Sequence, residues 1–444
     1  MESSKLVVKN NGISLTGEIE VAPDKSISHR SLIFAALGFG ESKITGLLQG
    51  HDVLNTAKAL ELMGIDIERG YDEKINKPVW KVNGMGMYGL TQPKNVLDMG
   101  NSGTAARLLA GLVSSRDFTS FFIGDESLTN RPMKRVFDPI KQIGGQVNAR
   151  DDRFMPFSIV GAADPLPIDY EMKIASAQVK SAILLAALNI HGRTTIIEPN
   201  KCRDHTEIMM KYLGLNIDIE PYGENGTKIS YEGMQEYDAK DFEVPGDISS
   251  AAFIIVAALI TKNSEITIKN VGINPLRDGI VKTLQEMNGD ITLVNKRQVC
   301  GEEVADLLVK SSNLKGIKVP ASRAPSMIDE YPILSIAAAF ADGVTLMEGL
   351  EELKVKESNR LLMIAENLKA CGVNVTMHDD SLEVQGGDFA KLDEPAKITT
   401  SHDHRIAMSF FVMGQMLDNG VEIDDTSMIA TSFPDFLDIF ARFQ

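Results

Sequence analysis

Seven short polar clusters stand out in the sequence, and six of them carry lysine or arginine. They are residues 24–30, 100–104, 129–132, 175–180, 202–207, 355–360 and 401–405. Arginine can hold a phosphate or a carboxylate through two parallel hydrogen bonds, and lysine adds a compact positive charge. If several clusters converge in space, they would bind substrates that carry more than one anionic group.

Each cluster also has an ordinary explanation when it is taken alone. A serine or aspartate before a helix, such as Ser26, Ser176 or Asp247, is a common N-cap. Residues 356–360 could form one charged helix face, and residues 100–104 lack the spacing of a Walker phosphate loop. Only the recurrence of the clusters at equivalent points of a repeat favours a shared site.

The pattern predicts a series of apolar helices, each of which opens at a polar residue. The starts are Ser26, Asn101, Ser176, Asp247, Asp329 and Asp403, at spacings of 75, 75, 71, 82 and 74 residues. Most of the polar clusters contain or adjoin such a start. Unpaired N–H groups and the helix dipole favour anions there.

A second predicted helix series alternates with the first, and each of its members ends at a glycine. The glycines are Gly64, Gly144, Gly214, Gly289 and Gly372, and residues 436–443 would form a sixth helix of this kind. Glycine past a helix end adopts a left-handed conformation without a Cβ clash, and the alternating residues that follow suit a strand. Six units of about 74 residues are therefore expected in an α/β or α+β fold, with a chance coincidence of short patterns as the alternative.

Proline and glycine mark two points at which the chain could pass between domains. These points lie at residues 23–24 and 245–247, and three of the predicted units fall between them. We expect a discontinuous domain of residues 1–23 plus 246–444, with residues 24–245 inserted as a second domain.

Composition excludes several classes of protein. The 45 Lys and Arg against 61 Asp and Glu give a net charge of −16, which disfavours a general nucleic-acid binder. Cys202, Cys300 and Cys371 lie far apart, so neither a disulfide framework nor a zinc cluster is expected. No signal peptide or transmembrane segment is visible, which favours a soluble cytoplasmic protein without membrane partners.

The clusters together resemble the 5-enolpyruvylshikimate-3-phosphate synthase family of enolpyruvyl transferases. The likeness runs from residues 25–30 (KSISHR) to residues 431–435 (TSFPD) and covers nearly the whole chain. It implies a two-domain, inside-out α/β barrel of six βαβαββ units, three per domain, with the active site in the interdomain cleft. The implied reaction moves the enolpyruvyl group of phosphoenolpyruvate to the 5-hydroxyl of shikimate 3-phosphate, without a metal or an organic cofactor. We expect a monomer.

The resemblance also implies roles for individual residues. Those that would bind shikimate 3-phosphate are Lys25, Ser26, Arg30, Ser176, Ala177, Gln178, Arg203, Asp329 and Lys356. Those that would surround phosphoenolpyruvate are Lys25, Asn101, Gly103, Arg131, Gln178, Arg360 and Arg405. Asp329 would take the hydroxyl proton and Glu357, near Lys25, would handle proton exchange at the methylene carbon, because addition and elimination need separate proton-transfer groups.

Two positions depart from the pattern of many family members. Ala177 replaces a second serine, so a backbone N–H or Arg203 would take over one phosphate contact. Thr431 replaces a lysine near phosphoenolpyruvate, which leaves one cation unaccounted for. The response to glyphosate stays open, since Gly103 matches sensitive members whereas residues 203–207 and 430–434 resemble the more tolerant class.

Two other functions remain as alternatives. A UDP-N-acetylglucosamine enolpyruvyl transferase has the same fold but typically carries a reactive loop cysteine, and residues 112–129 contain none. A noncatalytic binding module or an RNA-end-processing protein on a related repeat would be expected to have a basic face or a nucleotide motif. Neither sign is visible in this acidic sequence.

Overall fold

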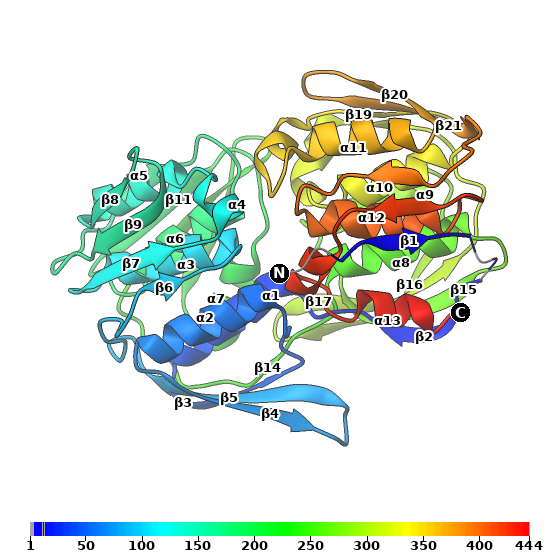
Figure 1. Ribbon diagram of the computed structural model, residues 1–444. Coiled ribbons are helices and arrows are strands. Elements are labelled where there is room, and N and C mark those ends of the chain that lie inside the picture. Colours follow the sequence, from blue (N-terminus) through cyan, green and yellow to red (C-terminus); the bar gives the residue numbers. More distant parts are fainter. Residues whose placement is uncertain (1–3, 11, 13, 444) are drawn as a thin grey trace. The chain divides into compact units, whose positions relative to one another are not determined.

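The computed structural model describes residues 4–10, 12 and 14–443, and the chain divides into two compact units (Figure 1). Unit 1 contains the described residues up to Asp24, then Pro245–Gln298 and the chain from Glu303 onward. Unit 2 contains Lys25–Val244 and the short segment Val299–Glu302. Helices and sheets occur in both units, so the predicted mixed α/β class is confirmed.

Unit 2 is built on three four-stranded sheets. Their strand orders are β14 (Phe242–Glu243), β3 (Phe39–Thr45), β5 (Lys77–Met85), β4 (Asp66–Asp72); β6 (Leu97–Asp98), β7 (Thr119–Ile123), β9 (Phe154–Val160), β8 (Gln146–Arg150); and β10 (Asp169–Glu171), β11 (Arg193–Glu198), β13 (Gly226–Glu232), β12 (Ile217–Tyr222). In each order the first two strands are parallel and the other neighbours are antiparallel. Its helices are α1 (Lys25–Leu37), α2 (His51–Leu62), α3 (Gly103–Ser114), α4 (Glu126–Thr129), α5 (Lys134–Ile143), α6 (Ala177–Ala187) and α7 (His205–Leu213).

The described residues of unit 1 form two four-stranded sheets and one three-stranded sheet. Their strand orders are β16 (Asp290–Val299), β17 (Glu302–Lys310), β15 (Glu265–Gly272), β2 (Thr16–Glu20); β18 (Lys318–Val319), β19 (Gly343–Met347), β21 (Leu382–Phe389), β20 (Val373–Met377); and β1 (Leu6–Val8), β23 (Val421–Ile423), β22 (Ala396–Ile398). Its α-helices are α8 (Ile248–Ile260), α9 (Gly279–Glu286), α10 (Tyr331–Ala339), α11 (Arg360–Ala370), α12 (His404–Gly414) and α13 (Phe436–Ala441). Three 3₁₀ turns, η1 (Ala321–Ser326), η2 (Glu351–Val355) and η3 (Ser427–Thr431), complete it.

The apolar helices of each unit form its core. Helix α3 packs against α6 in unit 2, and α8, α10 and α12 lie side by side in unit 1 (Figure 1). Helix α8 is buried from Ile248 to Leu259, as expected for a helix that is apolar on all sides. The polar clusters therefore adjoin rigid, buried elements.

Three of the six expected polar helix starts are confirmed as N-caps. The side chains of Ser176, Asp247 and Asp403 accept hydrogen bonds from backbone N–H groups of α6, α8 and α12. The other three expected starts are wrong by one or two residues. Helix α1 begins at Lys25 and includes Ser26, Ser102 rather than Asn101 caps α3, and Glu330 rather than Asp329 precedes α10.

Four of the five expected glycine stops are confirmed. Gly64, Gly144, Gly214 and Gly372 have φ of 97°, 107°, 92° and 81°. After α9 the left-handed residue is Asn288, with φ of 71°, and not Gly289. Asparagine tolerates this conformation, while a Cβ on Gly289 would come within 2.7 Å of the Leu284 carbonyl oxygen. Gly289 is thus required by close packing.

The two segments at which the chain passes between the units are paired with each other. The Asp24 N–H donates to the Pro245 carbonyl at 2.8 Å, and the Asp247 N–H donates to the Ala22 carbonyl at 2.9 Å. Gly246 also exchanges backbone hydrogen bonds with Asn270 and Gly272 of β15. The 245–247 passage therefore pairs with β15 of unit 1, and the 22–24 passage pairs with the 245–247 passage.

The hairpin of β16 and β17 has its tip, Val299–Glu302, in unit 2. There the Glu302 carboxylate lies 2.6 Å from His205 Nδ1 at the start of α7, and both side chains are buried. Gly301 lies against Ile208 and Tyr212 of the same helix. Within unit 2, the segment Val299–Glu302 therefore packs on α7.

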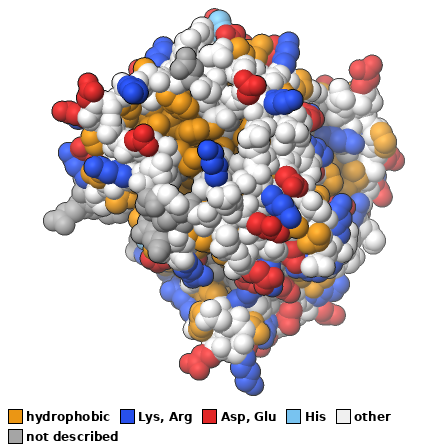
Figure 2. Space-filling model, turned by 90° about the vertical axis from the view of Figure 1, so that its right-hand side faces the viewer, with side chains coloured by type: hydrophobic (Ala, Val, Ile, Leu, Met, Phe, Trp, Pro, Cys, Tyr) orange, Lys and Arg blue, Asp and Glu red, His pale blue; other side chains and the backbone are white. Residues whose placement is uncertain are grey.

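On the face shown in Figure 2, acidic and basic side chains are interspersed and no continuous basic stripe is visible. Within residues 4–10, 12 and 14–443, no helix has both the length and the hydropathy needed to cross a bilayer.

Candidate active site

Arg30 joins three helices of unit 2. Its Nε donates to Thr206 Oγ1 at 2.8 Å, and its Nη2 donates to Ser181 Oγ at 2.7 Å. Its Nη1 donates to the carbonyl of Ser26 at 2.9 Å. The buried guanidinium therefore links α1 to α6 and α7 and fixes the first turn of α1, where Lys25 and Ser26 lie.

Lys25 is the first residue of α1, and its ammonium lies 3.0 Å from the Asp52 carboxylate of α2. The neighbouring His29 is fully buried, with Nδ1 2.7 Å from Thr56 Oγ1. Burial, together with the charges of Lys25 and Arg30, holds the pKa of His29 well below its usual value. His29 is therefore a neutral core residue and adds no charge to this cluster.

The first turn of α6 is connected to the first turn of α3. Gln178 Nε2 donates to Thr104 Oγ1 at 2.9 Å, and Gln178 Oε1 accepts from Arg107 at 2.9 Å. Arg107 also donates to the carbonyl of Gly103 at 3.1 Å. A Cβ on Gly103 would approach Arg107 Nη1 to 2.6 Å, so a larger residue there would displace the end of the Arg107 side chain. Sequence analysis missed Arg107. It lies four residues after Gly103, a spacing that places two residues on the same face of a helix and could have indicated a contact.

Arg131 is held against the loop before α3. It donates to both the carbonyl and the side-chain oxygen of Asn101, and to Ser127 Oγ at 2.9 Å. The Asn101 amide in turn donates to the Asp125 carboxylate at 2.6 Å. The structure thus brings together Asn101 and Arg131, two residues expected to act on the same substrate.

A buried ion cluster that sequence analysis missed supports the 202–207 segment. Lys180 donates to Glu198 at 2.9 Å, to Glu207 at 2.7 Å and to the carbonyl of Cys202 at 3.2 Å. The Lys180 side chain is 0% exposed. Burial raises the pKa of Glu207 despite the opposing effect of Lys180, and burial raises the pKa of Cys202 to about 12. Since Cys202 directly precedes Arg203, Lys180 fixes the backbone from which the expected phosphate ligand extends.

In unit 1, Arg360 is surrounded by three carboxylates. Its side chain lies 2.8 Å from Asp403, 3.1 Å from Asp329 and 2.5 Å from Glu357, and it is 1% exposed. These carboxylates, Asp403 first, raise the pKa of the guanidinium against the effect of burial. Lys356 lies farther from Asp329, at 3.9 Å. Both expected proton-transfer carboxylates, Asp329 and Glu357, therefore contact one arginine.

Arg405 is a second arginine that contacts Asp329, through the backbone of that residue. Its Nη1 donates to the backbone carbonyl of Asp329 at 3.1 Å and lies 3.6 Å from the buried carboxylate of Glu330. Burial raises the pKa of Glu330, against the effects of Arg277 and Arg405. Glu330 and Arg277 are further residues that sequence analysis missed.

The candidate site residues fall into two groups, one in each unit. The unit 2 group comprises Lys25, Ser26, Arg30, Asn101, Gly103, Arg131, Ser176, Ala177, Gln178 and Arg203. The unit 1 group comprises Asp329, Lys356, Glu357, Arg360 and Arg405. The structure links members of each group as described above.

No group of three or more metal-ligating side chains occurs among the residues that the structure describes. His402 is exposed and lies 3.3 Å from Asp425, whereas His404 is buried in the first turn of α12. The hydroxyl of Thr431 donates to the carbonyl of Met428, within η3.

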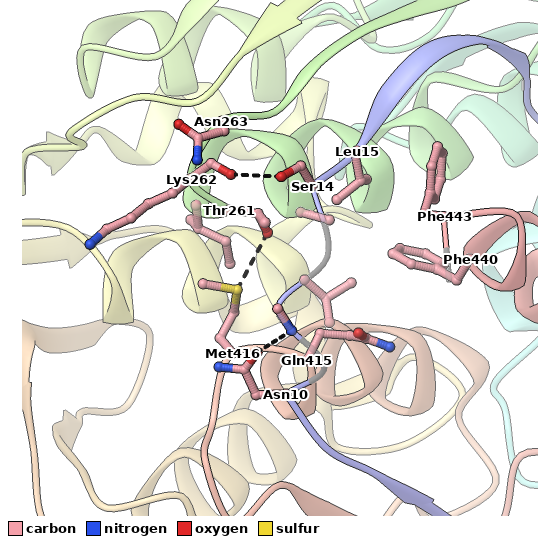
Figure 3. Close-up of a pocket in the computed structure, with 14 residues that line it drawn as sticks. Asn10, Ser14, Leu15, Thr261, Lys262, Asn263, Gln415, Met416, Phe440 and Phe443 are labelled. Carbon is pink, nitrogen blue, oxygen red and sulfur yellow. Dashed lines mark hydrogen bonds between the residues drawn. The ribbon is translucent and has the colours of Figure 1, made fainter.

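A pocket of about 410 Å³ lies in unit 1, and none of its described lining residues is a candidate site residue (Figure 3). Its described lining comes from Asn10, Gly12, Ser14 and Leu15, the end of α8, the end of α12 and the aromatic residues Phe440 and Phe443. Lys262 is the only charged residue of that lining, and its side chain extends away from the neighbouring residues. The pocket therefore lacks convergent groups suited to acid–base chemistry.

The sequence matches the family model for EPSP synthase (3-phosphoshikimate 1-carboxyvinyltransferase) over residues 9–440. The 3-phosphoshikimate 1-carboxyvinyltransferase of Paramagnetospirillum magneticum is 50% identical over 439 residues, which cover 99% of this chain and 97% of the relative. The protein of that name from Pseudomonas sp. strain PG2982 is 49% identical, with 98% and 96% covered.

Two solved structures are also similar to this chain in fold. EPSP synthase from Acinetobacter baumannii superposes with a TM-score of 0.85 at 40% identity, covering 99% of this chain and 98% of that one. The enolpyruvyl transferase NikO from Streptomyces tendae gives a TM-score of 0.76 at 16% identity over the same shares of the two chains. The second likeness shows a shared fold alone.

Proposed function

Because this chain belongs to the EPSP synthase family, we propose how its two groups of residues divide the work of the family's reaction. The chain is a 3-phosphoshikimate 1-carboxyvinyltransferase of the shikimate pathway, which leads to chorismate and the aromatic amino acids. It transfers the enolpyruvyl group of phosphoenolpyruvate to the 5-hydroxyl of shikimate 3-phosphate and releases phosphate.

Shikimate 3-phosphate is bound mainly by the unit 2 group in this proposal. The Ser176 hydroxyl accepts from a backbone N–H of α6, which leaves its own hydrogen for the phosphate. Ala177 has no hydroxyl, but its backbone N–H lies at the start of α6, where helical N–H groups favour anions. Lys25, Ser26, Arg30, Gln178 and Arg203 complete the set, with Asp329 and Lys356 from unit 1.

Phosphoenolpyruvate is bound by groups from both units. Lys25, Asn101, Gly103, Arg131 and Gln178 would contact it from unit 2, and Arg360 and Arg405 from unit 1. The hydrogen bonds of Asn101 to Arg131, and of Gln178 to Arg107, support this assignment because they hold the donors in place before the substrate arrives.

Asp329 acts as the base and Glu357 as the group that exchanges a proton with the methylene carbon. Asp329 accepts the 5-hydroxyl proton while the oxygen attacks C2 of phosphoenolpyruvate and C3 gains a proton, which gives a tetrahedral intermediate. Loss of a C3 proton and cleavage of the bond to phosphate then restore the double bond. The observation that carries this proposal is that Arg360 contacts Asp329 at 3.1 Å and Glu357 at 2.5 Å, so one buried side chain holds both proton-transfer carboxylates in place.

We propose that each unit is a domain of three βαβαββ units and that together they form the inside-out α/β barrel of the family. The domain limits would be residues 1–23 plus 246–444, and residues 24–245. The three sheets of each unit, with one parallel and two antiparallel pairings in every four-stranded order of unit 2, support this reading. The active site would form where the substrates bring the two groups together, in the interdomain cleft of a monomer.

The test is phosphate release from phosphoenolpyruvate with shikimate 3-phosphate, compared with UDP-N-acetylglucosamine as the acceptor. We expect release only with shikimate 3-phosphate, and the same rate after exhaustive chelation of metals. Release only with UDP-N-acetylglucosamine would overturn the assignment, as would release from phosphoenolpyruvate alone.

A further inference from the structure

Arg277 is a buried arginine placed where both interunit passages meet in unit 1. It follows β15, the strand to which Gly246 of the second passage is hydrogen-bonded, and is 4% exposed. Its Nη2 donates to Asp247 Oδ1 at 2.9 Å, and its Nη1 lies 3.7 Å from Asp24 Oδ2. Asp24 directly precedes Lys25, and Asp247 lies two residues after Pro245, so one guanidinium contacts a carboxylate on each passage.

The same guanidinium begins a chain of contacts that ends at Asp329. Nη2 of Arg277 donates to Ser249 Oγ at 2.6 Å, and Ser249 Oγ donates to the Glu330 carboxylate. Glu330 lies 3.6 Å from Arg405, which donates to the backbone carbonyl of Asp329 at 3.1 Å. Every member of this chain lies within unit 1.

Charge and burial restrict which side chain can occupy the position of Arg277. Asp24, Asp247 and Glu330 are buried carboxylates, and the nearby charges, Asp247 first and then Asp24, raise the pKa of Arg277 against the effect of burial. A planar guanidinium can reach acceptors in several directions at once, which an ammonium or an amide cannot do equally well. The contacts therefore depend on arginine, both for charge and for shape.

We propose that Arg277 is a positioning residue for the transfer reaction. It holds Asp24 and Asp247 together at the two passages and, through Ser249 and Glu330, fixes Arg405 and the backbone of Asp329. The inference rests on the proposed roles of Asp329 and Arg405 and goes beyond them, because Arg277 itself contacts neither of the two carboxylates assigned to proton transfer. A base that is displaced by even one ångström loses much of its effectiveness.

The experiment compares Arg277→Met with Arg323→Met in the full-length chain. Arg323 is a matched control, since it pairs with the half-exposed Glu286 in the same unit and lies outside the network. We expect Arg277→Met to lower kcat by about 10- to 100-fold while the Kd of shikimate 3-phosphate changes by less than about threefold, because most of its proposed ligands lie in unit 2. Arg323→Met should leave both quantities near the wild-type values.

A second variant separates positioning from charge balance. Arg277→Met with Glu330→Gln removes the cation together with one buried carboxylate, so it should melt closer to the wild-type temperature than Arg277→Met does. Its kcat should nevertheless stay low, and Arg277→Lys should restore kcat only in part. Recovery of kcat in the double variant, or full turnover in Arg277→Met, would overturn the inference. An inactive wild-type enzyme would instead refute the proposed function, so the two failures are distinguishable.

Discussion

Arg360 has little donor capacity to spare. Two of its nitrogens contact Asp403, and it also contacts Asp329 and Glu357. A guanidinium has five N–H donors, so one Nη1 hydrogen is left for a substrate anion in this arrangement. Arg360 therefore acts on the two carboxylates at least as much as on phosphoenolpyruvate.

Replacing Asp329 by asparagine tests its role as the base. The residue lies before α10, whose N-cap position is Glu330, and its carboxylate contacts Arg360 at 3.1 Å. We expect turnover to fall by roughly 10² to 10⁴, because the proton acceptor is lost, while shikimate 3-phosphate still binds. Steady-state kinetics and calorimetric titration measure the two effects.

Asp278→Asn is the control for that substitution. Asp278 occupies the N-cap position of α9 without a side-chain cap bond and pairs with Lys282, outside both groups of site residues. It should keep wild-type turnover. Near-normal turnover of Asp329→Asn as well would remove Asp329 from the mechanism and leave Glu357 as the main candidate.

The three cysteines should differ in reactivity. Burial raises the pKa of both Cys202 and Cys371 to about 12, so little thiolate forms near neutral pH. Burial also raises the pKa of Cys300, but this thiol is only partly buried and is therefore the most accessible of the three. We expect iodoacetamide at pH 8 to label Cys300 alone in the native enzyme, as read by peptide mass spectrometry, with turnover retained. Labelling of Cys202 before unfolding, or labelling that survives in Cys300→Ser, would contradict this.

At the scale of elements, the Lys180 cluster joins β11, α6 and α7. It also makes the stability of the fold depend on pH. Burial raises the pKa of Glu207 above its value in the unfolded chain. Such a group stabilises the fold fully below its unfolded pKa, and the contribution is lost as pH rises through the folded pKa.

Glu207→Gln removes this dependence and can still accept a hydrogen bond from Lys180. The stability of the variant relative to wild type should therefore increase from pH 5 to pH 8, by at most about 1.4 kcal/mol per pH unit. Urea unfolding at several pH values measures the difference. A stability difference that falls over this range would show that the pKa is not raised.

The hairpin tip gives a second prediction at this scale. Glu302→Ala leaves His205 buried without its carboxylate partner, which should cost about 1 to 3 kcal/mol and raise amide exchange in α7. Glu303→Ala, at the exposed neighbouring position, is the matched control and should change neither. Equal exchange in α7 for both variants would show that the tip does not stabilise this helix.

The repeat pattern predicted most helix ends because local chemistry decides them. Gly144 and Gly214 end helices for a reason that lies within a few residues, and Ser176 caps α6 for the same kind of reason. Asn288 and Ser102 were missed because another residue nearby could fill the same role. Packing decides which of two neighbouring residues ends or caps the helix.

Candidate site residues were predictable where the family motif names them, whereas their supports were not. Lys180, Arg107 and Arg277 contact groups that lie far away in the sequence, such as Glu198, Gln178 and Asp24. A single sequence gives no measure of such contacts. Buried polar groups nevertheless require partners, so the structure reveals them at once.

At the scale of the whole molecule, we expect the two units to close when the ligand binds, and the contacts within unit 1 bear on the physical cause of this closure. Bare cations in both groups would repel one another until phosphate binds, and relief of that repulsion would favour closure. In unit 1, however, Arg360 and Arg405 already lie beside carboxylates. Closure therefore depends on ligand contacts with both groups rather than on relief of repulsion.

We still expect shikimate 3-phosphate to favour a closed form, because its proposed ligands lie in both units. Small-angle X-ray scattering should show a smaller radius of gyration with the ligand than without it. Arg203→Ala should weaken the ligand dependence, since one proposed phosphate contact is lost. An unchanged radius at saturating ligand would refute closure.

The pairing of β1 with β23 has a consequence for synthesis. Leu6 lies opposite Ile423, and Val8 lies opposite Val421. At about 5 to 20 residues per second, β1 leaves the ribosome roughly 20 to 80 seconds before its partner exists. Residues 25–244, by contrast, are complete while much of unit 1 is still untranslated. The inserted unit can therefore fold first on the ribosome. Strand β1, by contrast, stays unpaired until β23 has been synthesised.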